Sequence, residues 1–544
     1  MKILFFGRRF NYFRNFDSVL RELASRGHAI HLVVERDTDD GRPLIDGLTA
    51  EFSGITCSVA PGRANDEWTW MAGRLRHGLE YLRYQHKLFD DTPKLRDRSR
   101  ARTPGFFVEL AERLGRHARW AYRPVSAILR WLERATPDDP AIRAFVEQHR
   151  PDVVLITPLI ALGSSQIDYL RAARSLGIPT ALCVWSWDHL SSKALIREPP
   201  DRVFVWNDTQ KREAMELHRV PADQIVVTGA QCFDKWFGRA PSRDRDTFCR
   251  QIGLPADRPI ILYVCSAPFI GSPPEAPFVV EWIRRIRAHA SPRLRDAPIL
   301  VRPHPSRRPE WEGVGVDAFR DVVVWGSDPV STDARADYFD TLFHSAIVVG
   351  LNTSAFIEAG IVGRPVHTIL LPEWYESQMG TVHFRYLFEA GGGLLISATT
   401  FEEHVGQLDR SLERPSTEIR PFVRAFVRPR GLDVPATPIF VDHVAQMEGM
   451  TVRPFPPPRF QRLARRVLNK GLTWRDDISR EHLVYSEREM ETVLRLRVSR
   501  QAKTAQDRER KREAVALKER RRAVQQLELE EHQAAKKSKR TASS

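Results

Sequence analysis

The chain is 544 residues long, and 42% of its residues are hydrophobic and 9% are aromatic. This composition excludes a globally disordered protein, and the length is typical of two folded domains and an appendage. The formal net charge of +14 favours anionic partners, namely phosphate-bearing substrates, an acidic membrane surface or nucleic acid.

The cysteines and the N-terminal residues predict a reducing, cytoplasmic setting. The five cysteines form no CxxC pair and are odd in number, which favours neither a zinc site nor a disulfide framework. The opening MKILFFGRRF has too few apolar residues for a signal peptide, and no apolar run predicts a membrane span. We therefore expect a cytoplasmic protein, with a peripheral position on the inner face of the cell membrane as an alternative.

The first fifty residues predict one strand, one helix and a second strand. Residues 2–7 form a short apolar run that ends at Gly7, and residues 16–28 carry apolar side chains at helical spacing. Residues 29–35 supply the next apolar strand. This order is the unit of a parallel sheet with a right-handed crossover.

A helical insertion is expected at about residues 65–150. This stretch is rich in Trp, Arg and Leu, and its apolar residues recur every three or four positions. Basic, Trp-bearing helix faces suit an anionic membrane surface, although helices packed on a sheet show the same pattern. Both interpretations remain open at this point.

Strand and helix patterns then alternate again up to residue 230. Strands are expected at residues 151–157, 178–187, 201–207 and 224–230, and helices at residues 165–177 and 208–220. The strands end in residue types that suit a ligand crevice at the carboxyl edge of a doubly wound sheet. Residues 1–243 are therefore predicted to form a Rossmann-like first domain.

A second alternating series follows a charged connector. Its strands are expected at residues 259–267, 297–305, 322–326, 346–352 and 365–371, and its helices at residues 276–290, 336–345 and 353–363. Residues 244–452 are predicted to form a second Rossmann-like domain, so the fold class is α/β with two parallel-sheet domains facing a cleft. Residues 453–544 mix both charges with few large apolar residues, which predicts a charged helical or partly disordered tail with a poor coiled-coil seam. Nucleic-acid binding by this tail is the disfavoured interpretation.

His304 is the first candidate for chemistry, because it follows an expected strand and stands between Pro303 and Pro305. The prolines remove two backbone donors and fix the backbone on either side of the imidazole. Arg302 precedes the histidine, and Arg307 and Arg308 follow it. Since guanidinium groups bind phosphate oxygens in a bidentate manner, this segment predicts a diphosphate clamp, with a basic surface turn as the alternative.

The segment VVGLNTSAFIEAGIVG is the second candidate. A strand is expected to end near Gly350, and a helix to begin near Thr353 or Ser354, so the free amides of the first turn predict an anion site beside Asn352. Glu358 lies four residues after Ser354 and therefore one turn deeper on the same face. A carboxylate at this position suits hydrogen bonds from ribose hydroxyls.

The order of these motifs resembles the GT-B superfamily of nucleotide-sugar glycosyltransferases, and in particular CDP-glycerol glycerophosphotransferases and polysialyltransferases. His304-Pro305 and Thr353-Ser354 look like the two donor-phosphate motifs of those enzymes, and Glu358 looks like their ribose-binding glutamate. The resemblance covers about residues 1–446. It implies a UDP-, GDP- or CDP/CMP-linked sugar on the second domain, a glycan or lipid-linked acceptor on the first, and no cofactor.

The resemblance also implies an acceptor base in the first domain. Asp188 or His189 is the candidate base, with Trp187 and Lys193 beside it on the acceptor side, and a helix cap is the alternative role of Asp188. Further contacts are expected from loops at the ends of strands. These are Gly7 and Arg8 toward the acceptor, Ser266 toward the donor phosphates, and Trp325 and Gly326 near the nucleobase.

No metal site is expected, because both DxD matches lie in solvated segments. Asp37-Thr38-Asp39 follows a strand, and Asp244-Arg245-Asp246 lies in the connector. The leading hypothesis is a metal-independent glycosyltransferase in surface-polysaccharide or glycolipid assembly, in which His304 and its neighbours stabilise the leaving group. The alternatives are a CDP-polyol phosphotransferase or nucleotide-sugar epimerase of the same fold, and a non-catalytic scaffold of a polysaccharide assembly complex.

Overall fold

The computed structural model describes residues 1–37, 41–64, 66–117, 119–269, 272–329, 331–414, 419–452 and 460–473. The expected charged tail therefore lies almost wholly outside the described residues, and so does its coiled-coil interpretation. Among the described helices, none is long and apolar enough to cross a membrane.

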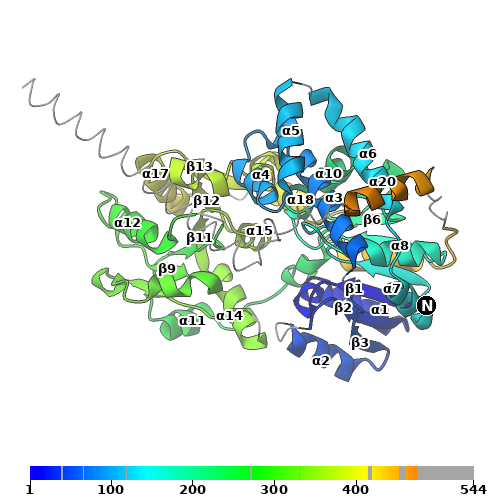
Figure 1. Cartoon of the computed structure of the whole chain (residues 1–544). Helices are drawn as coiled ribbons and strands as arrows, with labels where there is room; N and C mark the ends of the chain where they lie inside the picture. The colour runs from blue at the N-terminus through cyan, green and yellow to red at the C-terminus, as the bar shows by residue number, and fades with distance from the viewer. Residues whose placement is uncertain are drawn as a thin grey trace, which may run out of the picture. The chain divides into compact units, whose positions relative to one another are not determined.

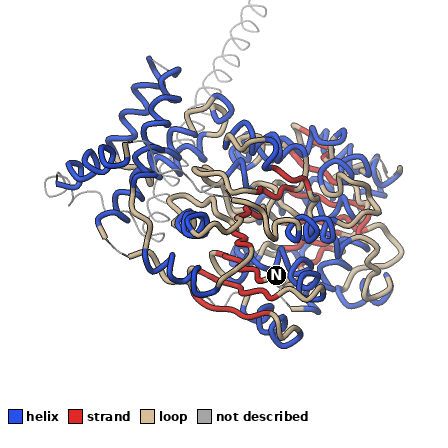
Figure 2. Tube along the Cα trace, turned by 90° about the vertical axis from the view of Figure 1, so that its right-hand side faces the viewer, coloured by secondary structure: helices blue, strands red, loops and turns tan. Residues whose placement is uncertain are grey.

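A seven-stranded parallel sheet organises the first domain (Figures 1 and 2). The strand order is β3-β2-β1-β4-β5-β6-β7, so the order reverses between β1 and β4, as in a doubly wound sheet. The strands are β1 Lys2–Gly7, β2 Ala29–Val34, β3 Ile55–Val59, β4 Val153–Ile156, β5 Thr180–Cys183, β6 Arg202–Val205 and β7 Ile225–Val227. The central strands are apolar and buried on both faces because helices cover the sheet.

The helices of the first domain bury the apolar faces that the sequence predicts. Helix α1 (Asp17–Ser25), for example, buries Val19, Leu20 and Leu23. The others that connect strands are α2 Arg42–Glu51, α7 Pro140–His149, α8 Ile167–Ser175, α9 His189–Ser192 and α10 Asp208–His218. Short 3-10 helices, η1 (Phe10–Phe16) and η5 (Gln231–Trp236), follow β1 and β7 at the carboxyl edge of the sheet.

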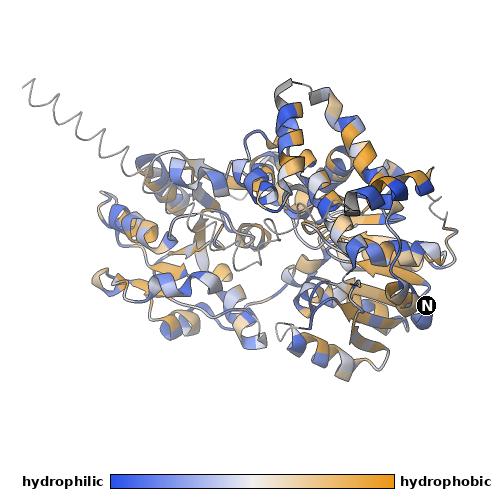
Figure 3. Cartoon of the chain, viewed as in Figure 1, coloured by the Kyte–Doolittle hydropathy of each residue, from blue (hydrophilic) through white to orange (hydrophobic). Residues whose placement is uncertain are grey.

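The expected insertion is helical and is held to the sheet domain by buried ion pairs. It contains α3 Glu67–Arg83, α4 Pro93–Arg100, α5 Gly105–His117 and α6 Tyr122–Ala135. In Figure 3, α5 and α6 carry both hydrophilic and hydrophobic residues. Arg76 of α3 contacts Glu133 of α6 at 2.9 Å and Asp168 of α8 at 2.9 Å. Arg171 of α8 contacts Glu133 at 2.8 Å. Helix α20 (Gln461–Thr473) packs on α6 and α3.

A six-stranded parallel sheet organises the second domain, in the order β10-β9-β8-β11-β12-β13. Its strands are β8 Ile260–Val264, β9 Ile299–Arg302, β10 Val322–Val324, β11 Ser345–Gly350, β12 Val366–Ile369 and β13 Leu395–Ala398. Its helices are α11 Arg245–Ile252, α12 Glu275–Arg287, α13 Pro292–Arg295, α14 Thr332–Phe343, α15 Ala355–Ile361, α16 Val382–Glu389, α17 Phe401–Glu413 and α18 Arg420–Phe426. The predicted fold class, two Rossmann-like parallel-sheet domains, is confirmed.

After the second sheet the chain returns to the first. Helix α19 (Ala436–Ala445) lies within the residues expected for the second domain, yet its Phe440, Val441 and Val444 pack in the core formed by β1, β2 and α1. The carboxylate of Asp234 in η5 accepts hydrogen bonds from the Thr437 backbone N–H at 2.6 Å and from the Ala436 N–H at 3.0 Å. The first sheet therefore has core residues from both ends of the described chain.

Candidate functional site

Three loops at the carboxyl edge of the second sheet are joined through Ser266. The Ser266 hydroxyl accepts a hydrogen bond from the backbone N–H of Asn352 at 3.1 Å. The Ser266 carbonyl accepts one from Arg307 Nε at 2.9 Å. The loops after β8, β9 and β11 are thus fixed against one another. This brings together the region of Ser266, His304 and Asn352, all expected from the sequence on the donor side.

His304 is half-buried, and its ring orientation is defined by a local hydrogen bond. Its Nδ1 accepts from the backbone N–H of Ser306 at 3.2 Å. Because Nδ1 is an acceptor, the neutral ring carries its proton on Nε2. Burial and the nearby Arg307 lower the pKa of His304. The side chain is therefore a neutral donor at the carboxyl edge, which suits a hydrogen bond to a phosphate oxygen.

Arg302 differs from the expectation of a free diphosphate clamp. It is 4% exposed, and Nη1 donates to Asp337 Oδ2 at 3.1 Å and Thr341 Oγ1 at 3.1 Å. Its Nη2 donates to the Ser327 carbonyl at 3.0 Å. These contacts use the guanidinium group to pin β9 to α14, because a buried charge needs partners. The guanidinium group of Arg302 is therefore engaged within the second domain.

The start of α15 offers fewer side-chain contacts than its sequence suggests. Ser354 is the exposed N-cap residue, and it makes no side-chain capping bond. Thr353 Oγ1 accepts from the Ala355 N–H at 3.3 Å, and the Asn352 side chain donates to the Ser377 carbonyl. Gly350 precedes them, where a Cβ atom would lie 2.7 Å from the Val264 carbonyl oxygen. The close approach of β8 thus requires glycine at the end of β11.

Glu358 lies under a tyrosine and among cations from both domains. The Tyr338 hydroxyl of α14 donates to its carboxylate. Three positive charges favour the ionised form of the Glu358 carboxylate. They belong to Lys235 of η5 and Arg14 of η1, which are exposed residues of the first domain, and to Arg302. Burial raises the pKa of Glu358 to about 7, against the opposing effects of Tyr338 and Lys235. Tyr338, Lys235 and Arg14 were not identified from the sequence. Lys235 follows a strand at the carboxyl edge of the sheet, and this position could have indicated that it lies near a ligand.

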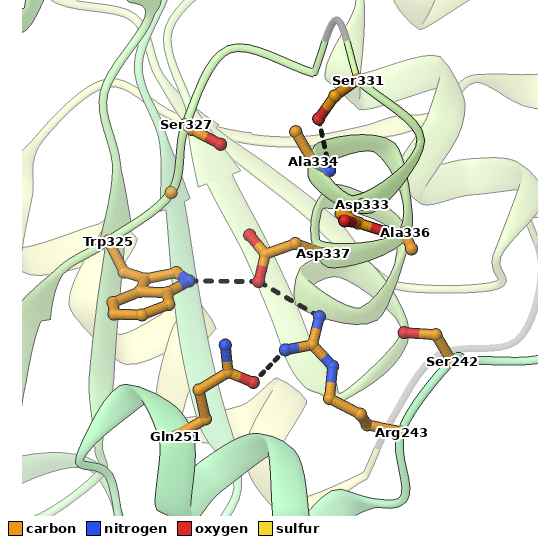
Figure 4. A pocket seen from close by; sticks show the side chains of 11 residues that line it. Ser242, Arg243, Gln251, Trp325, Ser327, Ser331, Asp333, Ala334, Ala336 and Asp337 are labelled. Carbon is orange, nitrogen blue, oxygen red and sulfur yellow. Dashed lines mark hydrogen bonds and ion pairs between the residues drawn. The ribbon is translucent and has the colours of Figure 1, made fainter.

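Trp325 and Gly326, expected near a nucleobase, line a cavity of about 720 Å³ (Figure 4). The Trp325 indole N–H donates to Asp337 Oδ1 at 3.2 Å, and Arg243 contacts the same carboxylate at 3.4 Å. Gln251 of α11 accepts from Arg243 on the opposite wall. Because Asp337 also binds Arg302, whose guanidinium lies 4.9 Å from the Tyr338 ring centroid, a continuous set of contacts joins this cavity to Glu358.

After β5, among the residues expected on the acceptor side, Asp188 is a firmly held carboxylate. Its Oδ1 accepts from Ser186 Oγ at 2.5 Å, and its Oδ2 accepts from Ser192 Oγ at 2.8 Å. Lys193 Nζ lies 2.9 Å from Oδ2. Burial alone would raise the pKa of Asp188, but Lys193, His383 and Ser186 outweigh it and lower the pKa. Although Asp188 occupies the N-cap position of α9, its side chain makes no capping bond.

His189 is not placed to act as the acceptor base that the sequence suggested. Its side chain is 0% exposed, and its Nε2 lies 2.9 Å from the Pro158 carbonyl oxygen. Its Nδ1 accepts from the Trp185 N–H at 3.4 Å. Burial lowers the pKa of His189 to about 3. Both ring nitrogens form hydrogen bonds with backbone groups of the first domain, so His189 stabilises the fold there.

Trp187, the expected acceptor-side aromatic residue, instead contacts a histidine that the sequence did not single out. The Trp187 ring lies edge-to-face with the ring of His383 of α16, with 4.6 Å between centroids. Trp187 is 7% exposed. Since His383 stands among apolar residues at the start of a helix, its sequence context is that of an ordinary helix face. This contact between the domains could not be found from the sequence.

The remaining expectations concern the end of β1 and the DxD segments. A Cβ atom on Gly7 would lie 2.8 Å from the Phe13 ring, so this glycine permits packing of η1 on β1. The charge of Arg8 acts on Glu35, whose pKa burial raises to about 7. Asp244 accepts from the Thr247 N–H at 2.8 Å as the N-cap of α11, and Asp37 pairs with Arg42. Asp39 lies outside the described residues.

Comparison with known proteins gives similarity of overall structure only. No protein-family profile and no curated protein matches the chain. A glycosyltransferase from Rickettsia africae is 11% identical, with a TM-score of 0.48 over 82% of this chain and 98% of its own. A putative UDP-N-acetylglucosamine 2-epimerase from Listeria monocytogenes is 12% identical, with a TM-score of 0.48 over 83% and 98%. Anabaena HepE, solved with UDP and glucose, is 10% identical, with a TM-score of 0.43 over 82% and 98%.

Proposed function

We propose that this protein is a glycosyltransferase that moves a sugar from a nucleotide-activated donor to an acceptor hydroxyl. The observation that carries the proposal is the setting of Glu358. This carboxylate lies beneath Tyr338, on the helix that follows Asn352, and within the electrostatic reach of Lys235 and Arg14 from the other domain. A ligand that binds here meets a hydrogen-bond acceptor and positive charge together.

The donor fits this arrangement group by group. Ribose hydroxyls are donors that an ionised Glu358 accepts, and accepting them favours its charged form. In this proposal Lys235, Arg14 and the Nε2 proton of His304 balance the negative charge of the phosphates, and the same groups stabilise the charge that develops on the leaving group. The cavity lined by Trp325, Asp337 and Gln251 supplies an aromatic wall and polar groups that suit the nucleobase of the donor.

Thermal unfolding in the presence of UDP, GDP, CDP, CMP and their sugar conjugates tests this proposal. At a concentration about 100 times its Kd, the correct nucleotide contributes about 2.7 kcal/mol of stability and raises Tm. Glu358→Gln and His304→Ala are expected to weaken that nucleotide at least about tenfold, equivalent to about 1.4 kcal/mol of binding free energy. Glu281→Gln, the same chemical change on the outer face of α12, is the matched control and should respond like the wild type.

The outcomes separate the competing functions. If none of these nucleotides raises Tm, or if Glu358→Gln responds like the wild type, the proposal is wrong. Chromatography of the products then follows with the nucleotide sugar that binds. A transferase passes the sugar to an added acceptor or slowly to water and releases the nucleotide, whereas an epimerase changes the sugar and keeps it attached to the nucleotide.

A further inference from the structure

His383 is a buried histidine whose Nδ1 has no hydrogen-bond partner among the described residues. It lies at the start of α16 and is 7% exposed. Its Nδ1 is fully buried, and no described residue forms a hydrogen bond with this atom. Leaving such a polar atom unpaired in the protein interior is unfavourable. Buried polar groups of this kind often mark a place where a ligand or water completes the bonding.

Two other buried histidines, His218 and His189, have both ring nitrogens paired with backbone groups. His218 Nε2 lies 2.8 Å from the Leu190 carbonyl oxygen, and His189 Nε2 lies 2.9 Å from that of Pro158. His404 also lacks partners, but it is 0% exposed and packs near Trp282 and His367 inside the second domain. His383 is distinguished by its neighbours, because they are charged and reach solvent.

Those neighbours are Asp188 and Lys193, the charged groups that act on His383. The Asp188 side chain is 19% exposed and that of Lys193 is 32% exposed, so the cluster is open to solvent on their side. Both oxygens of Asp188 are already bonded, to Ser186, Ser192 and Lys193. A carboxylate held in this way has a lowered pKa and is a weak base. Burial lowers the pKa of His383 to about 4, so the ring is neutral and its unpaired nitrogen can accept a proton.

We propose that His383 is the general base that deprotonates the acceptor, and that Asp188 is the fixed charge that stabilises the resulting imidazolium. This inference rests on the proposed transferase function. The acceptor O–H proton moves to a ring nitrogen of His383 while the acceptor oxygen forms a bond to the anomeric carbon. The bond from that carbon to the nucleotide oxygen breaks, and the nucleotide leaves with the electron pair. The acceptor is thereby a hydroxyl compound that enters beside Asp188 and Lys193.

The two domains contribute one member each, so the pair depends on contacts that hold α16 against the first domain. The Tyr386 hydroxyl of α16 donates to Glu213 of α10 at 2.8 Å. Lys94 of α4 lies 2.5 Å from Glu376, which precedes α16. Val382 packs with Tyr84 and Phe89 of the insertion. The helical insertion therefore helps to place His383 beside Asp188.

The test uses the full chain and the nucleotide sugar that stabilises the wild type. Release of nucleotide, with water as the acceptor, gives a rate that needs no knowledge of the natural acceptor. His383→Gln is expected to lower this kcat by about 10²–10⁴-fold, the usual contribution of a general base. The Tm shift caused by the nucleotide should be retained. His289→Gln, another histidine of the second domain, should keep both the rate and the shift.

A titration of the histidine rings by NMR gives a readout independent of turnover. The signal that His383→Gln removes should titrate below pH 6.5, move to lower pH in Asp188→Asn, and move to higher pH in Lys193→Met. This inference is wrong if His383→Gln leaves the rate unchanged, or if the His383 titration is the same in Asp188→Asn and Lys193→Met as in the wild type. In either case, binding of a nucleotide by the wild type would still support the proposed function. Loss of nucleotide stabilisation in the wild type would overturn both.

Discussion

Two arginines near β9 show that sequence neighbours do not reveal which partner a buried charged side chain contacts. Arg302 and Arg307 both flank His304 in a strongly basic segment, and both are buried. Arg307 contacts Glu310 at 2.7 Å and the Ser266 carbonyl, while Arg302 contacts Asp337. The partner of Arg302 lies 35 residues away in the sequence. The positions of these side chains at the sheet edge were predictable, but their ion pairs depend on tertiary packing.

Arg302 should therefore matter for stability more than for phosphate binding. In Arg302→Lys the guanidinium fork is lost, and the donors of one ammonium nitrogen do not span Asp337 and Thr341, bonded by Nη1, together with the Ser327 carbonyl, bonded by Nη2. We expect a loss of roughly 2 kcal/mol in the free energy of unfolding. Thermal and urea unfolding measure this loss, and His304→Ala is the comparison. An Arg302→Lys protein as stable as His304→Ala would contradict the structural role.

The directions of the side chains after β5 were likewise not predictable from the sequence. Asp188, His189 and Lys193 follow a strand, and this position correctly places them at the carboxyl edge of β5. Whether a side chain points into the core or the cleft there is decided by the loop conformation. His189 turns toward the Pro158 carbonyl oxygen, whereas Asp188 turns toward Lys193. Sequence periodicity carries no signal for such a choice.

At the scale of elements, the alternation of strands and helices was predictable because buried parallel strands read as apolar runs. Strands such as β1, β4 and β11 are of this kind. Strand β13 was not predicted, and its residues are only partly buried over most of its length. The residues of α19 were assigned to the second domain only because they follow its strands in the sequence. Its apolar residues indicate a helix with a buried face, but they do not say which sheet that face covers.

The attachment of α19 gives a prediction at this scale. In Asp234→Asn the amide nitrogen would replace the oxygen that accepts from either Ala436 or Thr437 and would face that donor. Arg428, which lies 2.8 Å from Asp234, would lose its counter-charge. We expect about 3 kcal/mol of destabilisation and earlier proteolytic cleavage between α18 and α19. Limited proteolysis followed by mass spectrometry detects the cut.

Asp442→Asn is the matched control for this experiment, because Asp442 is an exposed residue of α19 that pairs with Arg26 at 2.5 Å. Exposed pairs contribute only about 0–1 kcal/mol. Its Tm and proteolytic pattern should stay close to those of the wild type. Equal cleavage in the two variants would show that Asp234 does not anchor the helix.

At the scale of the whole molecule, buried ionisable groups determine how stability depends on pH. Burial lowers the pKa of His189 and His367 to about 3 and that of His404 to about 4. The unfolded chain protonates these rings below about pH 6.5, so they reduce stability as the pH falls from there to their folded pKa values, by about 1.4 kcal/mol per pH unit for each ring. Glu275 and Glu358, whose pKa values burial raises to about 7, act in the opposite direction between about pH 7 and pH 4.5.

Below about pH 4.5 the opposing effect of the glutamates is complete, and the remaining groups act together. The pKa values of Asp188 and Asp168 are lowered by their cationic partners despite burial, so the stability they contribute is lost as the pH falls below about 4. Because the three rings outnumber the two glutamates, we expect the free energy of unfolding to fall by about 1.4 kcal/mol per pH unit from pH 6.5 to 4.5 and more steeply below it. Chemical denaturation across this range measures the profile. A stable protein at pH 3.5 would contradict the assignment of these buried charges.

The return of α19 to the first sheet also fixes the order in which the domains are completed during synthesis. Phe440, Val441, Val444 and Met447 belong to the core of the domain that begins at residue 1. A ribosome adds roughly 5–20 residues per second, so the strands β1 to β7 wait, with part of their core uncovered, until the chain beyond residue 447 emerges. The second sheet and its helices, which end at Phe426, are complete before that moment. The domain that starts first is finished last.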